Sequence, residues 1–150
     1  MSYLIQFWNN PIVLPALTAW FVAQFLKTLI NWRIQRKFDL QRMWGSGGMP
    51  SSHTSLTICA ATMIGFVQGF DTPLFATAVI LAFIVMYDAS GVRLETGKQA
   101  KILNELITRI FTAEEVDEAL LKELIGHKPI EVFCGAVLGV LVAWVFHYWL

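Results

Sequence analysis

Reactive side chains in this sequence gather at the borders of its long apolar stretches. Two histidines, two cations, two acids and a glycine–serine run stand at such borders. If the stretches are helices that end at one depth, these side chains meet, and together they suit phosphate ester chemistry. In chain order the candidate residues are Gln24, Lys27, Gly48, Ser51, Ser52, His53, Asp88, Arg93, His127 and Glu131.

Phosphate binding is the first chemistry that this pattern indicates. Gly48 precedes a Pro-Ser-Ser-His run, and a helix that starts there would present unpaired N–H groups and the positive end of its dipole to an anion. Glycine lets the backbone curl close to the anion, and Ser51 and Ser52 add hydroxyl donors. Lys27 and Arg93 can neutralise the remaining phosphate charge.

The histidines supply the second half of the chemistry. His127 and Glu131 are four residues apart, so on a helix they share a face. A carboxylate there can hold an imidazole in one tautomer and stabilise its cation, as a nucleophilic or basic histidine requires. His53 comes from another segment and is free to donate a proton to a leaving alkoxide.

Each of these residues also has a plainer interpretation when it is taken alone. A lysine that closes a span is often an anchor whose ammonium reaches the interface, and Arg93 would mark the cytoplasmic side. A single histidine near an interface often belongs to its polar belt. Asp88 ends an apolar run and needs a partner, for which Arg93 is the simplest. The coincidence of all these residues at one depth favours a site.

The elements that must position these residues are membrane spans. Hydrophobic residues form 56% and charged residues 15% of the 150 residues, against roughly 45–50% and about 25% in soluble domains. A span needs roughly 20 mostly apolar residues. We therefore expect an all-α, polytopic membrane helical bundle of about four transmembrane helices, forming a single domain over residues 1–150. The expected spans are Ile12–Ile30, His53–Phe70, Pro73–Gly91 and Ile130–Leu150.

The distribution of basic residues predicts the orientation of the spans. All 11 Lys and Arg residues lie between Lys27 and Lys128. The positive-inside rule therefore puts the first and third connections in the cytoplasm and both termini outside. We expect the bacterial cytoplasmic membrane, with the candidate residues facing the cytoplasm. The formal net charge of +0 offers no field for nucleic acid, so no such partner is expected.

The long third connection, Val92 to Lys128, is expected to be helical. Apolar residues recur at helical spacing from Ile102 to Phe111. Thr112 and Glu115 form a capping-box pattern that starts another helix. We predict two amphipathic cytoplasmic helices that lie on the membrane or cap the bundle, and simple packing helices explain the pattern equally well.

The segment from Lys27 to about Gly139 resembles the type 2 phosphatidic acid phosphatase superfamily, which also includes vanadium-dependent haloperoxidases. The resemblance rests on Lys27, on Pro50-Ser51-Ser52-His53 and on His127 with Glu131. The fuller strings look like the small, divergent membrane branch of that superfamily. They are Gly47-Gly48-Met49-Pro50-Ser51-Ser52-His53-Thr54, Asp88-Ala89-Ser90-Gly91-Val92-Arg93 and Gly126-His127-Lys128-Pro129-Ile130-Glu131-Val132.

The resemblance implies hydrolysis of a phosphate ester through a phosphohistidine, with no metal and no cofactor. It gives His127 the role of nucleophile and His53 the role of general acid. Glu131 would hold His127, and it stands where the superfamily usually has Asp.

The same resemblance assigns the phosphate to Lys27, to Ser51 and to the backbone of Ser52. Arg93 substitutes for an arginine that the superfamily usually places shortly before the nucleophile. Four spans are fewer than the six typical of lipid phosphatases in this superfamily, which favours a homodimer.

The sequence therefore predicts a membrane lipid phosphatase. A headgroup phosphate lies at the interface, where the candidate residues lie, while the acyl chains stay in the bilayer. A substrate like phosphatidylglycerophosphate or phosphatidic acid is the first choice, and a polyprenyl phosphate is the second. A vanadate-dependent haloperoxidase and a non-enzymatic, lipid-binding membrane protein are the other interpretations. Halide oxidation dependent on vanadate and peroxide would support the former, and lipid co-purification without turnover would support the latter.

Overall fold

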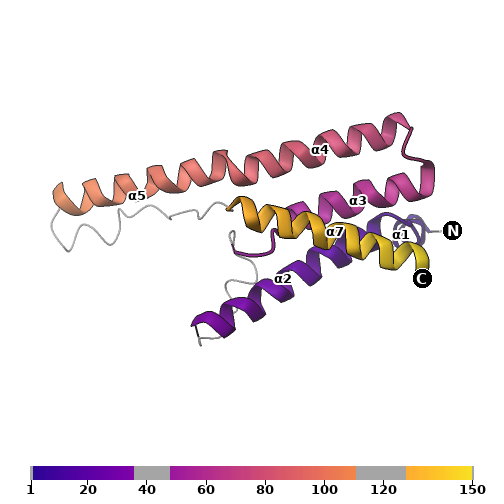
Figure 1. Ribbon diagram of the computed structural model, residues 1–150, viewed down its shortest axis with the longest axis horizontal. Helices are drawn as coiled ribbons and strands as arrows, with labels where there is room; N and C mark the ends of the chain where they lie inside the picture. The colour runs from indigo at the N-terminus through magenta and orange to yellow at the C-terminus, as the bar shows by residue number, and fades with distance from the viewer. Residues whose placement is uncertain (1, 36–47, 111–127, 150) are drawn as a thin grey trace.

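The structure, a computed structural model, describes residues 2–35, 48–110 and 128–149, without the side chains of residues 34, 35, 93, 94 and 110. The described part is all-helical, as the sequence predicts (Figure 1). Its helices are α1 (Tyr3–Trp8), α2 (Val13–Gln35), α3 (Ser52–Gln68), α4 (Pro73–Ser90), α5 (Val92–Ile110) and α7 (Pro129–Trp149).

Local hydrogen bonds fix where several of these helices begin and end. The Asn10 side chain accepts from the N–H of Ile12 at 2.9 Å just before α2. Thr72 caps α4, because its hydroxyl accepts from the N–H of Phe75 at 3.3 Å. Gly69 ends α3 with a φ of 107°, a conformation that favours glycine and turns the chain toward α4.

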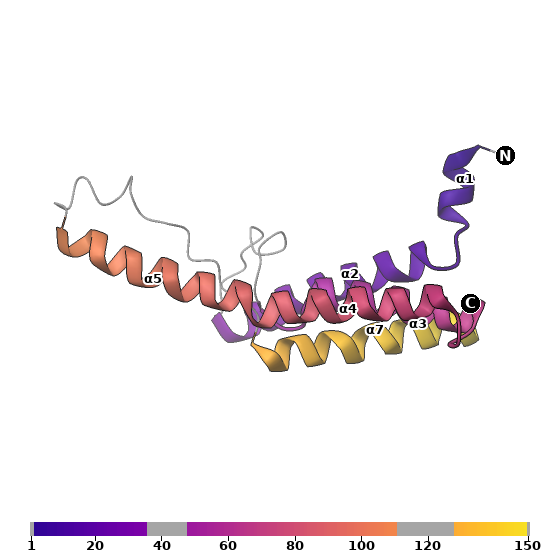
Figure 2. The same cartoon turned by 90° about the horizontal axis from the view of Figure 1, so that it is seen from above.

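α3 is the central helix of the bundle. It contacts α2, α4 and α7, whereas α2 and α4 do not contact each other in the described ranges. α3 and α7 begin, and α4 ends, at one end of the bundle, which we call the site end (Figure 1). α1 and the end of α7 lie at the opposite end (Figure 2). This arrangement agrees with both termini lying on one side of a membrane.

The contact between α3 and α7 depends on two glycines. A Cβ atom added to Gly135 would lie 2.6 Å from the carbonyl oxygen of Ser51, and one added to Gly139 would lie 2.6 Å from that of Ser55. Small residues at this spacing allow two membrane helices to approach closely. The core beside this contact is also built from small or slender residues. They are Ala19, Cys59, Met63 and Ala143.

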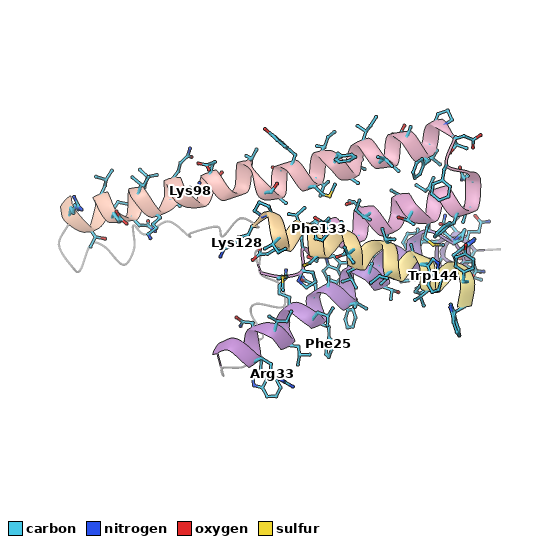
Figure 3. The ribbon with its side chains drawn as sticks, in the orientation of Figure 1. Phe25, Arg33, Lys98, Lys128, Phe133 and Trp144 are labelled. Atoms are coloured by element: carbon cyan, nitrogen blue, oxygen red, sulfur yellow. The ribbon has the colours of Figure 1, made fainter. Side chains whose placement is uncertain are left out.

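Three stretches of the described helices are long and apolar enough to cross a membrane. They lie over Val13–Arg33, Pro73–Arg109 and Pro129–Trp149. The second expected span forms α3, whose 17 residues rise about 25 Å, short of a hydrocarbon core of about 30 Å. Large apolar side chains such as Phe25 point outward, as lipid-facing residues do (Figure 3). The fold is thus a membrane helical bundle.

α5 is helical, as its periodicity predicts, and of the placements left open for it the structure does not show capping of the bundle. Gly91 alone separates it from α4, and α5 extends past the site end without folding back (Figures 1 and 2). Among the described elements α5 contacts only α4. The second amphipathic helix, expected from Thr112 onward, lies outside the described residues.

Candidate phosphate-binding site

Residues from three helices meet at the site end. α2 passes this point, while α3 and α7 both begin there (Figure 1). Figure 3 shows Lys128 at this end and Trp144 toward the other. The predicted site residues that the structure links here are Lys27, Gly48, Ser51 and Glu131, with Ser52 next to Ser51 in the first turn of α3.

The first turn of α3 is capped and buried. Ser51 is the N-cap, and its hydroxyl oxygen accepts from the N–H of Thr54 at 3.4 Å and from the Thr54 hydroxyl at 3.0 Å. Both bonds use Ser51 Oγ as the acceptor, so its own O–H proton can still be donated to an anion. Ser52 is 2% exposed, and its N–H belongs to the first turn, where a helix supplies no carbonyl partner.

The backbone N–H of Ser51 is not available to an anion. It donates to the carbonyl oxygen of Glu131 at 3.0 Å. One turn later in α3, the Ser55 hydroxyl lies 2.9 Å from the carbonyl oxygen of Ser51 and 3.0 Å from that of Gly135. The start of α3 is therefore joined to the start of α7 by one backbone hydrogen bond and by the Ser55 side chain.

Lys27 is buried inside the bundle and is 6% exposed. It lies in the last turn of the expected span Ile12–Ile30, and α2 continues two turns beyond it to Gln35. The interpretation as an anchor at the interface does not fit, since an anchoring lysine keeps its ammonium in water. Gln24, one turn earlier in α2, is buried as well.

Gly48 lies directly against the stem of Lys27. Its φ is 89°, and a Cβ atom added to it would lie 3.1 Å from Cγ of Lys27. Glycine at this position thus permits both the backbone conformation and the close approach. The sequence predicted a glycine that lets the backbone curl close to an anion, and the structure adds that this glycine covers the lysine.

Glu131 supplies a negative charge beside Lys27. Its carboxylate lies within electrostatic range of the Lys27 side chain, and it accepts from the backbone N–H of Lys128 at 3.2 Å. The second contact is half of a capping box at the start of α7. His127 lies outside the described residues, so the hold of Glu131 on that imidazole stays a prediction.

His53 follows Ser52 in the first turn of α3, but its side chain is exposed. It is two residues from both Ser51 and Ser55, which places it about 200° around the helix from each. Ser51 and Ser55 contact α7, so His53 lies on a different side of α3. The structure therefore places the His53 backbone in the first turn of α3 and its side chain away from the α7 contact.

Asp88 lies in the last turn of α4 and is partly buried. This turn is at the site end (Figure 1). Arg93 is in the first turn of α5, and its side chain is outside the described part of the structure. The Asp88–Arg93 pair and a phosphate-binding role for Arg93 therefore stay predictions.

Three residues that fasten the site were missed in the sequence. Thr54 and Ser55 are fully buried and bond to Ser51, and Gly135 admits the close approach of α3. The available signal was the pair Gly135 and Gly139, four residues apart in an apolar stretch, a spacing typical of helix contacts in membranes.

A metal site does not emerge from the described ranges, which hold no group of three His, Cys, Asp or Glu side chains placed to bind an ion. Lys27 and Glu131 bring one basic and one acidic side chain to this place, so a phosphate needs further donors, and the first turn of α3 supplies N–H and O–H groups.

A small polytopic membrane bundle with this Pro-Ser-Ser-His turn beside a buried lysine belongs to the class of PAP2-related membrane proteins. The chain is a member of the divergent PAP2 family, whose sequence model matches residues 8–142. It is similar to an uncharacterized membrane protein, YuiD, of Bacillus subtilis (strain 168). The two are 38% identical over an alignment of 151 positions, which covers 93% of this chain and 95% of that protein. No solved structure matches the chain. The resemblance seen in the sequence is confirmed.

Proposed function

We propose that this protein is a metal-independent phosphatase that hydrolyses a lipid phosphomonoester at the cytoplasmic face of the membrane. One observation carries the proposal: the buried Lys27 lies against Gly48, three residues before the Ser51 cap of a helix. A buried cation needs an anion close by, and a helix N-terminus is suited to the same anion. Family membership supports the same class of chemistry.

The proposed reaction proceeds in two balanced steps. A ring nitrogen of His127 attacks phosphorus, the P–O ester bond breaks, and the leaving alkoxide takes a proton from His53. Water then attacks phosphorus and gives a proton to His53, the N–P bond breaks with its electron pair returning to His127, and inorganic phosphate is released. Glu131 would stabilise the cationic ring of His127 in both steps.

The substrate class follows from the predicted position of the site. A phosphate on a membrane lipid is held at the interface, and its hydrocarbon chains stay among lipid-facing helices. We propose a glycerophospholipid precursor such as phosphatidylglycerophosphate or phosphatidic acid, with a polyprenyl phosphate as the second choice.

A second candidate function is binding of a lipid phosphate without turnover. Three observations favour it, of which the first two are that Glu131 is an acid within electrostatic range of Lys27 and that the Ser51 N–H is already bonded to α7. An exposed His53 also fits binding better than proton transfer. Turnover separates the two candidates.

The experiment is phosphate release by the purified protein, with EDTA, across phosphatidylglycerophosphate, phosphatidic acid and a polyprenyl phosphate. Lys27→Met removes the buried charge, and Arg33→Met removes an exposed cation from the same helix as the matched control. We expect metal-independent release that falls at least about 100-fold in Lys27→Met and persists in Arg33→Met. Lipid binding that depends on Lys27, without release from any substrate, would support the second candidate instead.

A further inference from the structure

The fastening between α3 and α7 has no assigned role in the proposed chemistry. It consists of the Ser51 N–H bond to the Glu131 carbonyl and of the Ser55 hydroxyl between two carbonyls, at 2.9 Å from Ser51 and 3.0 Å from Gly135. Gly135 makes room for it, since a Cβ atom there would lie 2.6 Å from the Ser51 carbonyl oxygen.

Ser55 differs from the other hydroxyl residues of α3 in what it reaches. A serine or threonine within a helix commonly donates to the carbonyl four residues earlier. Thr62, two turns further along α3, does this with Ile58 at 2.8 Å. Ser55 makes the same local contact with Ser51 and also lies within hydrogen-bond distance of α7, so its single proton is shared between two helices.

The two segments joined by Ser55 are those that proposed catalysis must hold in register. The first turn of α3 is the phosphate-binding part. Glu131 and Gly135 lie one turn apart in α7, and Glu131 is four residues after His127 in the sequence. A nucleophile must stand about 3–3.5 Å from the atom it attacks, and a misplacement of about 1 Å can cost roughly 100-fold in rate.

We propose that Ser55 is a positioning residue, which sets the spacing between the start of α3, where the proposed phosphate is held, and the start of α7, which carries Glu131. The proposal rests on the proposed function, because it needs a phosphate and a nucleophile to align. It assigns Ser55 no contact with the substrate. Loss of its hydroxyl should therefore affect the chemical step and leave the affinity for phosphate intact.

The test compares Ser55→Ala with the control Thr62→Ala. The Thr62 hydroxyl is in the same helix but bonds to the carbonyl of Ile58, within α3. Turnover of the lipid phosphate and inhibition by inorganic phosphate are measured for each purified protein. We expect kcat to fall about 10–100-fold in Ser55→Ala, with the inhibition constant for phosphate within about twofold of the original. Thr62→Ala should change neither value. An unchanged kcat in Ser55→Ala, or equal losses of turnover and phosphate binding, would overturn the proposal.

Hydrogen exchange followed by mass spectrometry gives a readout that does not need turnover. If Ser55 fastens α3 to α7, exchange should become faster at the start of both helices in Ser55→Ala and stay unchanged there in Thr62→Ala. Gly135→Ala, which pushes against the Ser51 carbonyl, should have the same effect as Ser55→Ala. Unaltered exchange at both helix starts would refute the positioning role, whether or not the original protein hydrolyses lipid phosphates.

Discussion

At the scale of single residues, the burial of Lys27 is the most informative feature. Removing an ammonium from water costs several kcal/mol unless charge and hydrogen bonds compensate. Glu131 supplies one compensating charge, and a phosphate that arrives at the first turn of α3 would supply more. The pair alone is neutral, so we propose that donors from the turn complete the phosphate site.

Gly48 provides a direct test of the cover over Lys27. Gly48→Ala introduces a methyl group 3.1 Å from Cγ of Lys27 at a φ of 89°. Gly69→Ala is the matched control, since Gly69 has a φ of 107° and ends α3 away from its capped first turn. Both changes should cost about 1–2 kcal/mol of stability from backbone strain. We expect only Gly48→Ala to lower kcat/KM for the lipid phosphate, by about 10-fold or more; equal activities of the two variants would contradict this role.

His53 is proposed as a general acid although its side chain is exposed. His53→Ala should reduce turnover of an alkyl phosphate roughly 10²–10⁴-fold. A nitrophenyl phosphate should be affected much less, because nitrophenolate departs without protonation. With the alkyl substrate, the turnover of Glu131→Gln should lie between that of His53→Ala and that of the original protein. The check is turnover of both substrates by each variant, and equal losses on both substrates in His53→Ala would remove the general acid from the mechanism.

At the scale of the helices, the close contact of α3 and α7 holds the site together. The contact is possible because Gly135 and Gly139 lack side chains where α3 carbonyl oxygens approach. α3 is short and central, and it therefore depends on its neighbours for its position rather than on its own length.

Gly139→Ala tests this dependence away from the phosphate site. The added methyl group would lie 2.6 Å from the Ser55 carbonyl oxygen, and overpacking of this kind costs about 1–3 kcal/mol. Val137→Ala changes a residue of the same helix that is 43% exposed, and it should cost less than about 0.5 kcal/mol. Unfolding in mixed micelles measures both, and comparable stabilities of the two variants would show that the close contact is not needed.

The helices could be predicted from the sequence better than their ends and their packing. Apolar runs predicted the spans, but the first span was expected to end at about Ile30, whereas α2 continues to Gln35. Hydropathy shows where charged residues begin along the sequence. It does not show that a helix can continue past a charged residue and bury it where neighbouring groups compensate the charge. The link between Ser55 and Gly135 joins residues 80 apart in sequence, and only packing can reveal such a pair.

At the scale of the whole molecule, orientation in the membrane decides which substrates can reach the site. Figure 3 shows Arg33, Lys98 and Lys128 toward the site end, with Trp144 near the other. This arrangement agrees with the predicted cytoplasmic position of the site end. α5 extends beyond that end with exposed apolar residues, which are Val92, Ile102, Leu103 and Leu106. A homodimer remains a prediction.

Cysteine labelling in intact cells tests this orientation. The background carries Cys59→Ala and Cys134→Ala, because both native cysteines are free thiols. Ser2→Cys should react with a membrane-impermeant maleimide, whereas Lys98→Cys should react only after the cells are permeabilised. Both positions are exposed, so burial does not explain a difference between them. The reverse pattern would place the site outside and remove the basis for a cytoplasmic lipid substrate.

The central claim, that phosphate bound at the first turn of α3 is transferred to His127, is tested most directly by trapping the phosphoenzyme. The protein is mixed with a labelled lipid phosphate and EDTA, quenched under alkaline conditions and mapped by mass spectrometry. The account predicts a base-stable, acid-labile phosphohistidine at His127 that disappears in His127→Ala and persists in His53→Ala. A phosphoenzyme that persists in His127→Ala and disappears in His53→Ala would contradict it.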